Sequence, residues 1–373
     1  MRICYVSSVL TIHDGKFLKK FQEKGYEVHV VSFIDRDVEK IEGIMYHILP
    51  VKFSEESLHL SGAVRLVPNI IRSTMFLKKI IREVKPDILH GGFIQKDGLI
   101  CALSGFHPFL LMPWGSDVVV LPERSSLIKM MTRYILRRAD MIVCDTEYME
   151  KSVIRIIGYP KDVKIFSHGI DLNRFKFDFD GCVILRERLG WEDKKVLIMT
   201  RLFYPIYGIE YFLESLIEVM REVSDVRVIM CGDGPLRDKF TKFVDKHLLG
   251  EYVFFTGNVP NNDLPEYYNA ADIYVSSSLS DGISQSLLEA MACGLPVIVT
   301  DIPSNREWII NGENGFIVPR EDSKVLSGRL LQLLQDEVLQ KEFGRRNLKI
   351  AKERADWNKN FEKLVEVYEH LKL

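Results

Sequence analysis

The sequence predicts a protein of the α/β class, in which two domains are each built around a doubly wound parallel sheet. The chain has 373 residues, a length that favours two domains over one or three. Its composition, 47% hydrophobic and 27% charged, is that of an ordinary globular enzyme. Short apolar runs rich in β-branched residues alternate with segments of helical period along the chain, and this pattern is typical of parallel α/β sheets.

The first domain, residues 1–167, is expected to hold six strands with helices between them. Each predicted strand is a short apolar run bounded by polar residues, and the strands are Ile3–Ser7, Val28–Phe33, Met45–Leu49, Ile88–His90, Phe109–Met112 and Met141–Cys144. The predicted helices repeat apolar residues every three or four positions, at Lys16–Lys24, Asn69–Glu83, Leu127–Arg138 and Glu147–Ile157.

The second domain, residues 168–354, begins in a segment whose composition shifts. Ser167–Lys194 is rich in Gly, Asp and aromatic residues, as expected of a domain connection. Six further strands are predicted, at Val196–Met199, Arg227–Cys231, Val253–Thr256, Ile273–Ser276, Val297–Thr300 and Phe316–Val318. The last segment, residues 355–373, has a helical apolar period over Trp357–Leu371, and we expect this helix to cross back to the first domain.

Charge, cysteines and hydropathy exclude several classes of protein. The net charge of −2 argues against nucleic acid as a partner. The six cysteines show no Cys-x-x-Cys pair and no neighbouring His cluster, so we expect buried free thiols and no metal site. No apolar stretch reaches the roughly 18 residues of a membrane helix. The opening segment MRICYVSSVL reads as a strand rather than an export signal, which predicts a cytoplasmic protein.

The most informative segment is Ser276–Asp301, which reads as strand, polar turn, helix, Gly stop and strand. The helix is predicted from Ser284 to Cys293, with Gly294 as its left-handed cap. Its first turn would offer the unpaired N–H groups of Gly282, Ile283 and Ser284, and a helix amino end attracts anions. The segment therefore predicts a phosphate site.

Two carboxylates flank that helix. Asp281 precedes its first turn, and Glu289 lies four residues past Gln285 and so shares a face with it. One carboxylate could accept hydrogen bonds from sugar hydroxyls and the other from ribose hydroxyls. Spacing alone leaves a second interpretation open, in which Asp281 is a turn residue and Glu289 a solvated helix position.

The same segment resembles the retaining glycosyltransferases of family four, which have the GT-B fold. Their pattern is Glu, seven residues, Glu, then Ala-Met-Ala-x-Gly-x-Pro-Val. Glu289 and the run AMACGLPVIVTD match it, and Asp281 occupies the first Glu position. Six further motifs occur along the chain in the same order as in the family. They are KPDILH at 85–90, RADMIVC at 138–144, HGIDLNRF at 168–175, CGDGP at 231–235, FTGNV at 255–259 and NGENGFIV at 311–318.

The resemblance implies two Rossmann-like domains facing across a cleft, with no bound metal or cofactor. It also implies transfer of a hexose or N-acetylhexosamine from a UDP- or GDP-sugar to a sugar or lipid-linked acceptor, with retention, in glycan, polysaccharide or glycolipid synthesis. Arg201 and Asp281 would be catalytic. The implied donor-binding residues are Gly15, Arg201, Tyr207, Gly257, Asn258, Val259, Asp281, Gly282, Ile283, Ser284 and Glu289.

The chain departs from the family at two further positions. A Lys normally stands six residues after the Arg that contacts the donor diphosphate, and here that position is Tyr207. Trp114 stands where the family commonly has His, whereas Gly115, Ser116 and Asp117 keep the loop chemistry. We expect Trp114 and Asp117 in the acceptor site or cleft wall, with a packing role for Trp114 as the alternative. The departures also leave open a nucleotide-sugar-binding pseudo-enzyme, acting as a subunit of a biosynthetic complex.

The motif CGDGP resembles part of a dinucleotide fingerprint, but Arg237 stands at the third glycine position and the motif lies in the second domain. We therefore expect a tight strand-to-helix turn that lines the donor site, rather than a nicotinamide enzyme.

A basic helix is predicted at 125–138. Residues 1–165 carry 24 Lys and Arg against 19 Asp and Glu, so the basic charge gathers in the first domain. Lys129, Arg133 and Arg137 recur every four residues with apolar residues around them, and a basic amphipathic helix can lie on an anionic bilayer. The expectation is peripheral contact with the cytosolic membrane face. The alternative is a core-packed helix with a solvated charged stripe.

Overall fold

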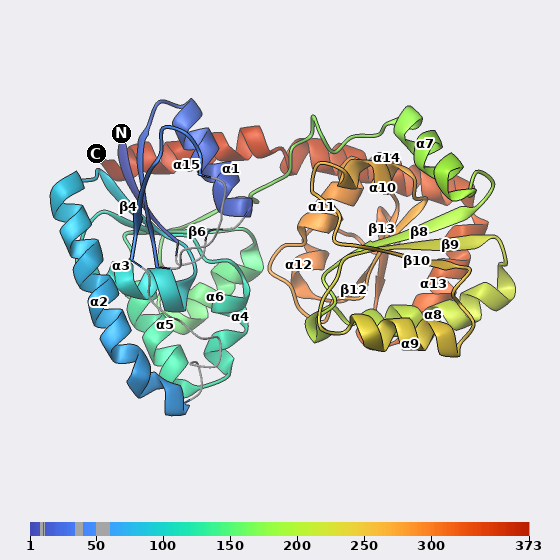
Figure 1. The fold of residues 1–373 in the computed structure, drawn as a ribbon, viewed down its shortest axis with the longest axis horizontal. Coiled ribbons are helices and arrows are strands. Elements are labelled where there is room, and N and C mark those ends of the chain that lie inside the picture. Colours follow the sequence, from blue (N-terminus) through green and yellow to red (C-terminus); the bar gives the residue numbers. More distant parts are fainter. Residues whose placement is uncertain (8–9, 11, 34–39, 50–59, 373) are drawn as a thin grey trace. The chain divides into compact units, whose positions relative to one another are not determined.

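The computed structural model describes residues 1–7, 10, 12–33, 40–49 and 60–372 (Figure 1). The chain divides into two compact units. The first consists of Met1–Phe166 together with Phe361–Leu373, and the second of Ser167–Asn360. Each unit is built on one parallel β-sheet, so the predicted α/β class is confirmed. In the described ranges, no helix is both long and apolar enough to cross a membrane.

The sheet of the first unit has seven parallel strands in the order β3-β2-β1-β4-β5-β6-β7. The strands are β1 Arg2–Val6, β2 Glu27–Ser32, β3 Met45–Ile48, β4 Ile88–Gly91, β5 Phe109–Leu111, β6 Met141–Cys144 and β7 Val163–Ile165. The order runs outward in both directions from the β1–β4 pair, which is the doubly wound arrangement. The sequence did not predict β7, which is a three-residue edge strand with two exposed residues.

Helices cover both faces of this sheet. They are α1 Ile12–Glu23, α2 Leu60–Val84, α3 Leu99–Ser104, α4 Ser116–Val119, α5 Ser126–Arg138, α6 Glu147–Ile157 and α15 Trp357–Lys372, with a π-helix η2 Ile94–Gly98 and a 3-10 turn η3 Leu121–Glu123. Cys4, Val6 and Leu89 point into one cluster with side chains of α2, α3, α5 and α6. The loop residues Ser8, Val9 and Thr11, part of the predicted first loop, lie outside the described residues.

The last helix belongs to the opposite face of the first sheet. Tyr5 and His90 are register partners on β1 and β4, and their rings meet edge to face at 4.7 Å. The Tyr368 hydroxyl of α15 is hydrogen-bonded to His90 Nδ1. The ring centroid of Phe361 lies 5.2 Å from that of Phe21 of α1. Burial lowers the pKa of His90 to about 3, so this imidazole is neutral and structural.

The sheet of the second unit has six parallel strands in the order β10-β9-β8-β11-β12-β13. The strands are β8 Lys195–Thr200, β9 Val226–Cys231, β10 Val253–Gly257, β11 Ile273–Ser276, β12 Val297–Thr300 and β13 Gly315–Val318. The order reverses beside β8, so the carboxyl ends of β8 and β11 meet at the topological switch point. Ligands bind at this point in doubly wound sheets.

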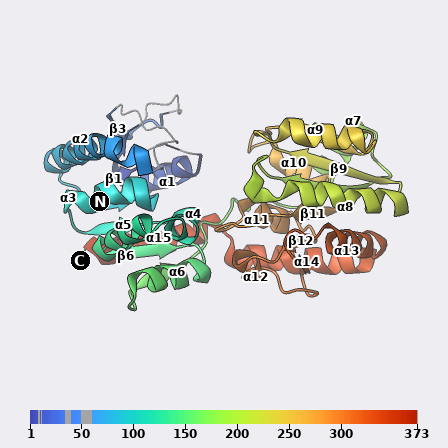
Figure 2. The same ribbon diagram turned by 90° about the horizontal axis from the view of Figure 1, so that it is seen from below.

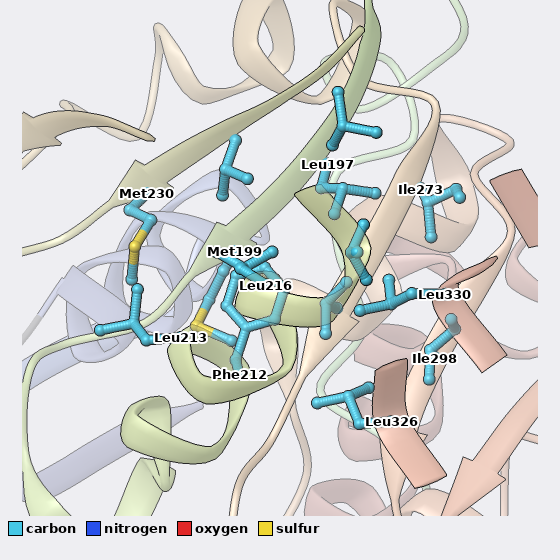
Figure 3. Packing of buried hydrophobic residues seen from close by; sticks show 14 of the residues in the cluster. Leu197, Met199, Phe212, Leu213, Leu216, Met230, Ile273, Ile298, Leu326 and Leu330 are labelled. Atoms are coloured by element: carbon cyan, nitrogen blue, oxygen red, sulfur yellow. The ribbon is translucent and has the colours of Figure 1, made fainter. Parts of the chain in front are cut away.

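Helices cover both faces of this second sheet (Figure 1), and Figure 2 looks onto one of the two helix layers. They are α7 Phe179–Leu189, α8 Ile209–Glu222, α9 Arg237–Lys246, α10 Leu264–Asn269, α11 Gln285–Ala292, α12 Pro303–Arg306, α13 Ser323–Gln335 and α14 Glu337–Arg354, with a 3-10 turn η4 Pro205–Tyr207. Leu197 and Met199 of β8 pack against Phe212 and Leu216 of α8, as Figure 3 shows. Val196 and Ile198 alternate to the other face, where they join residues of α10 and α11.

Candidate active site

The predicted donor-binding residues gather mainly at the carboxyl ends of β8 and β11. Arg201 directly follows β8, and the loop 277–284 connects β11 to α11. Two hydrogen bonds join the loops that carry these residues. Leu279 N–H donates to Ile206 O at 2.8 Å, and Ser277 Oγ donates to Tyr207 O at 3.0 Å. The switch point of the sheet therefore holds the two loops side by side.

Glycines permit the close approach of three loops. Gly208 has φ +54°, and a Cβ there would lie 2.5 Å from Ser277 O. Gly232 of the CGDGP motif has φ +148°, and a Cβ on it would lie 2.0 Å from Arg201 O. Only glycine fits such positions without moving the backbone. The CGDGP motif is thus a tight turn packed beneath Arg201.

Arg201 is the centre of the site. Its Nη2 lies 2.8 Å from Asp281 Oδ2 and also donates a hydrogen bond to Ser284 Oγ. Its side chain is only 10% exposed. Burial acts to lower the pKa of Arg201, but the Asp281 carboxylate outweighs it and the pKa is raised. Nε is buried without a hydrogen-bond partner in the part of the chain that the structure describes.

The helix after the loop begins one residue later than predicted. Helix α11 starts at Gln285 because Ser284 is its N-cap, with Ser284 Oγ accepting from Leu287 N–H at 3.1 Å. The first helical N–H groups are therefore those of Gln285 and Ser286, rather than those of Gly282 to Ser284. The helix ends at Ala292, one residue before the predicted Cys293, and Gly294 has the expected left-handed conformation at φ +79°.

Glu289 lies inside the protein. It is only 6% exposed, and its Oε2 accepts a hydrogen bond from the Tyr268 hydroxyl at 2.9 Å. The Tyr268 hydroxyl in turn lies 2.7 Å from Oγ1 of Thr200, which is the last residue of β8. A solvated helix position, the alternative left open by the spacing, is therefore wrong. The contact of Glu289 with ribose stays a prediction.

Tyr207 stands beside Arg201. The guanidinium carbon of Arg201 lies 5.1 Å from the centroid of the Tyr207 ring, within cation–π range. Burial raises the pKa of the Tyr207 hydroxyl. A neutral aromatic face thus contacts Arg201 at the position where the family carries a second cation.

The other predicted donor-binding residues of this unit lie around the same loops. Gly282 is buried, and Ile283 packs against the cluster beneath α11. Gly257 ends β10 with φ +72°, and its carbonyl accepts from Gly232 N–H at 2.8 Å. Asn258 is exposed and Val259 is half-buried. The segment 257–259 is thus joined to the Arg201 loop through the Gly232 turn.

Three predicted residues belong to the first unit. Asp117 is fully buried, and its carboxylate accepts from Ile94 N–H at 2.9 Å and from the N–H groups of Trp114 and Gly115. Burial raises its pKa to about 6, against the effect of these bonds. Asp117 therefore shapes the loop that carries Trp114, which is half-buried, and acceptor contact stays a prediction for both. Gly15 lies inside α1 with open space at its Cβ position.

Sequence reasoning missed two buried tyrosines. Tyr268 on α10 contacts Glu289, and Tyr274 on β11 is hydrogen-bonded to Ser286 Oγ at 2.8 Å. Both side chains are fully buried. Their positions in the runs EYYNAA and DIYVSS read only as core positions, and nothing in the pattern separates them from other buried aromatics.

Metal ligands were not expected here. Over the described ranges, the structure brings together no group of three or more His, Cys, Asp or Glu side chains suited to a metal ion. The polar groups at the switch point are one guanidinium, two carboxylates, several hydroxyls and a helix amino end. This set suits an anionic ligand that also carries hydroxyls.

Comparisons with known proteins agree with this chemistry. The family model "Glycosyl transferase 4-like" matches residues 2–146, and "Glycosyl transferases group 1" matches residues 184–350. N-acetyl-alpha-D-glucosaminyl L-malate synthase of Bacillus anthracis is 24% identical over 358 residues, which cover 94% of this chain and 90% of that protein.

A second relative and a solved structure extend the comparison. The GDP-mannose-dependent alpha-(1-6)-phosphatidylinositol monomannoside mannosyltransferase of Mycolicibacterium smegmatis is 26% identical over 215 residues, 55% of this chain and 56% of that one. Anabaena HepE in complex with UDP-glucose matches with a TM-score of 0.80 and 19% identity, and the match covers 100% of both chains. The chain therefore belongs to the group 1 glycosyl transferases and has their GT-B fold.

Proposed function

We propose that this protein is a retaining glycosyltransferase that moves a hexose or N-acetylhexosamine from a UDP- or GDP-sugar to a sugar or lipid-linked acceptor. The observation that carries the proposal is the Arg201 side chain. It is buried at the carboxyl end of β8, and its Nε lacks a protein partner among the described residues. A diphosphate oxygen would satisfy that donor beside the amino end of α11.

In the proposed reaction, the bond between the anomeric carbon and the diphosphate oxygen breaks as the acceptor hydroxyl attacks from the same face. The departing diphosphate takes the acceptor proton, so no covalent protein nucleophile is required. Arg201 stabilises the charge that develops on the leaving group. Asp281 holds sugar hydroxyls, and Glu289 holds ribose hydroxyls.

The donor is tested by direct turnover. UDP-glucose, UDP-N-acetylglucosamine and GDP-mannose are each offered to the purified protein with simple sugars and with a lipid extract. We expect transfer, or slow hydrolysis, with at least one donor. Release of nucleoside diphosphate from none of them, by a protein that still binds the nucleotide, would favour the pseudo-enzyme.

A lipid-linked acceptor is supported by features of helix α5 and by the relative that glycosylates a phosphatidylinositol monomannoside. Leu127, Met130 and Tyr134 are exposed at spacings of three and four residues, so they form one apolar stripe. Of the predicted cations, Arg133 Nε donates to Ile156 O at 2.6 Å and Arg137 Nη2 to Ile157 O at 3.0 Å. These bonds hold the carboxyl end of α6, so the apolar stripe is the better target for mutation.

Vesicle flotation tests membrane contact through α5. We expect the wild type to float with anionic vesicles at low salt and less at high salt, because apolar insertion and charge attraction act together. Leu127→Ser/Met130→Ser/Tyr134→Ser should abolish flotation. The control Leu248→Ser/Ile310→Ser/Val338→Ser removes exposed apolar residues of the second unit and should float normally. Equal behaviour of the two triple variants would exclude α5 as the contact.

A nucleotide-sugar-binding pseudo-enzyme is the alternative, favoured by the neutral Tyr207 and by the pairing of Arg201 with Asp281. If a lost Lys explained inactivity, Tyr207→Lys would create transfer. We expect this change instead to leave kcat/KM unchanged or to lower it severalfold, since the new cation would stand beside Arg201 and remove its aromatic contact.

The matched control for this change is Tyr204→Lys, which adds the same charge to an exposed position of the same loop. Initial rates with the preferred donor decide the matter. A large gain of transfer in Tyr207→Lys, absent from Tyr204→Lys, would support the pseudo-enzyme.

A further inference from the structure

Two chains of hydrogen bonds, most of them buried, run from the core of the second unit to the donor-binding groups. One begins at Tyr268 of α10 and the other at Tyr274 of β11, and both tyrosines are fully buried. A buried hydroxyl with fixed partners orients those partners, because an alternative rotamer would leave a polar group without a hydrogen bond.

The first chain leads to Glu289. The Tyr268 hydroxyl donates its only hydrogen to Glu289 Oε2 at 2.9 Å. Its oxygen must therefore accept the hydrogen of Thr200 Oγ1, which lies 2.7 Å away. Thr200 is half-buried at the last position of β8. The direction of the chain is therefore fixed: Thr200 donates to Tyr268, and Tyr268 donates to Glu289, so that one carboxylate oxygen is held in place.

The second chain leads to Arg201. Ser284 Oγ accepts from Leu287 N–H and from Arg201 Nη2, which uses both of its acceptor positions. Its own hydrogen must therefore point to Ser286 Oγ, 3.2 Å away. Ser286 Oγ is bonded to the Tyr274 hydroxyl at 2.8 Å. Tyr274 thus fixes the serine pair that directs Arg201 toward Asp281.

The two chains contain consecutive residues at the carboxyl end of β8, Thr200 and Arg201, but they serve different groups. The ring centroids of Tyr268 and Tyr274 lie 6.3 Å apart, but the hydroxyl groups of the two tyrosines bond to different partners. The first ends on the carboxylate proposed for ribose, and the second on the guanidinium proposed for the diphosphate.

We propose that Tyr268 and Tyr274 are separate positioning residues, Tyr268 for nucleoside affinity through Glu289 and Tyr274 for diphosphate binding and turnover through Ser284 and Arg201. The inference rests on the proposed function, because it assigns each tyrosine to one half of the proposed donor.

Tyr268→Phe and Tyr274→Phe remove one hydroxyl each and keep the ring. The probes are the nucleoside diphosphate that the wild type binds, UDP or GDP, and the corresponding monophosphate, both titrated by calorimetry. Tyr268→Phe should raise both dissociation constants by the same factor, about tenfold, with little change in kcat. Tyr274→Phe should raise the diphosphate constant more than the monophosphate constant, and should lower kcat about tenfold.

Tyr368→Phe is the matched control, since Tyr368 is a fully buried tyrosine whose hydroxyl contacts His90 in the first unit. It should leave both dissociation constants and kcat unchanged. If a tyrosine variant does not fold, Thr200→Val and Ser286→Ala each remove the hydroxyl next to the tyrosine in the same two chains.

A double-mutant cycle adds a second readout. If Tyr268 acts through Glu289, then Tyr268→Phe should change nucleotide affinity far less in a Glu289→Ala background than in the wild type.

The result that would overturn the inference is a uniform one. The inference fails if Tyr268→Phe and Tyr274→Phe change the affinities for diphosphate and monophosphate in the same way, or if neither variant changes them. It also fails if Tyr368→Phe causes the same loss of affinity. Each of these results would mean that the chains are ordinary core packing. Failure of the proposed function is distinguishable, because wild-type protein that binds neither UDP nor GDP would remove the donor site itself, and the inference with it.

Discussion

Arg201→Ala should lower kcat/KM by roughly 100-fold, on the scale of losing one strong charge-stabilising contact in a catalytic site. Among the described residues, Arg201 is the one cationic side chain that contacts Asp281 and Ser284, at the amino end of α11. With Tyr207 at the position of the usual Lys, no second cation of that loop replaces it. Affinity for UDP or GDP should fall as well, because the diphosphate loses its direct partner. Steady-state kinetics and nucleotide titration measure the two effects.

Arg186→Ala is the matched control. Arg186 is also a mostly buried arginine of the second unit in an ion pair, with its Nη2 2.8 Å from Asp272 Oδ1. Its loss should lower the melting temperature but leave kcat/KM within a few-fold of wild type. Arg201→Lys should fall between wild type and Arg201→Ala, since lysine keeps the charge but not the planar guanidinium. Unchanged turnover in a folded Arg201→Ala protein would remove Arg201 from the site.

Asp281→Asn should be nearly inactive, whereas Asp281→Glu should keep substantial activity. The proposed contact with sugar hydroxyls needs a carboxylate, and the glutamate is longer by one bond of about 1.5 Å. For nucleotide affinity, the structure predicts a change in the opposite direction from the change in activity. Because Asp281 pairs with Arg201 at 2.8 Å, its neutralisation frees the guanidinium. Asp281→Asn should therefore bind UDP or GDP at least as tightly as wild type while losing turnover.

This separation of binding from turnover identifies the role of Asp281. Asp301→Asn is the control, because Asp301 also pairs with an arginine, Arg306, after the neighbouring strand β12. It should retain normal rates. Loss of nucleotide affinity in Asp281→Asn, parallel to its loss of rate, would show that the pair with Arg201 serves structure rather than the sugar.

Local pattern was sufficient for the sheets. Each predicted strand is present with its ends within one residue, because buried parallel strands are continuous apolar runs that turn residues interrupt. Strand β7 was missed because three residues with two exposed side chains carry no such run. Helix α7 was missed because Phe179–Leu189 lies in a segment whose Gly and Asp content indicates a connection.

The sequence by itself determined the α/β class, the family pattern and the residues Arg201, Asp281, Ser284 and Glu289 as one candidate site, because motif residues follow strand ends and strand ends converge in a doubly wound sheet. Tertiary structure alone decided which of these residues touch. Glu289 proved buried against Tyr268, Arg201 paired with Asp281, and Tyr207 faced the guanidinium. These contacts join residues of different elements across the sheet, and hydrophobic periodicity records only which face of its own element a residue occupies.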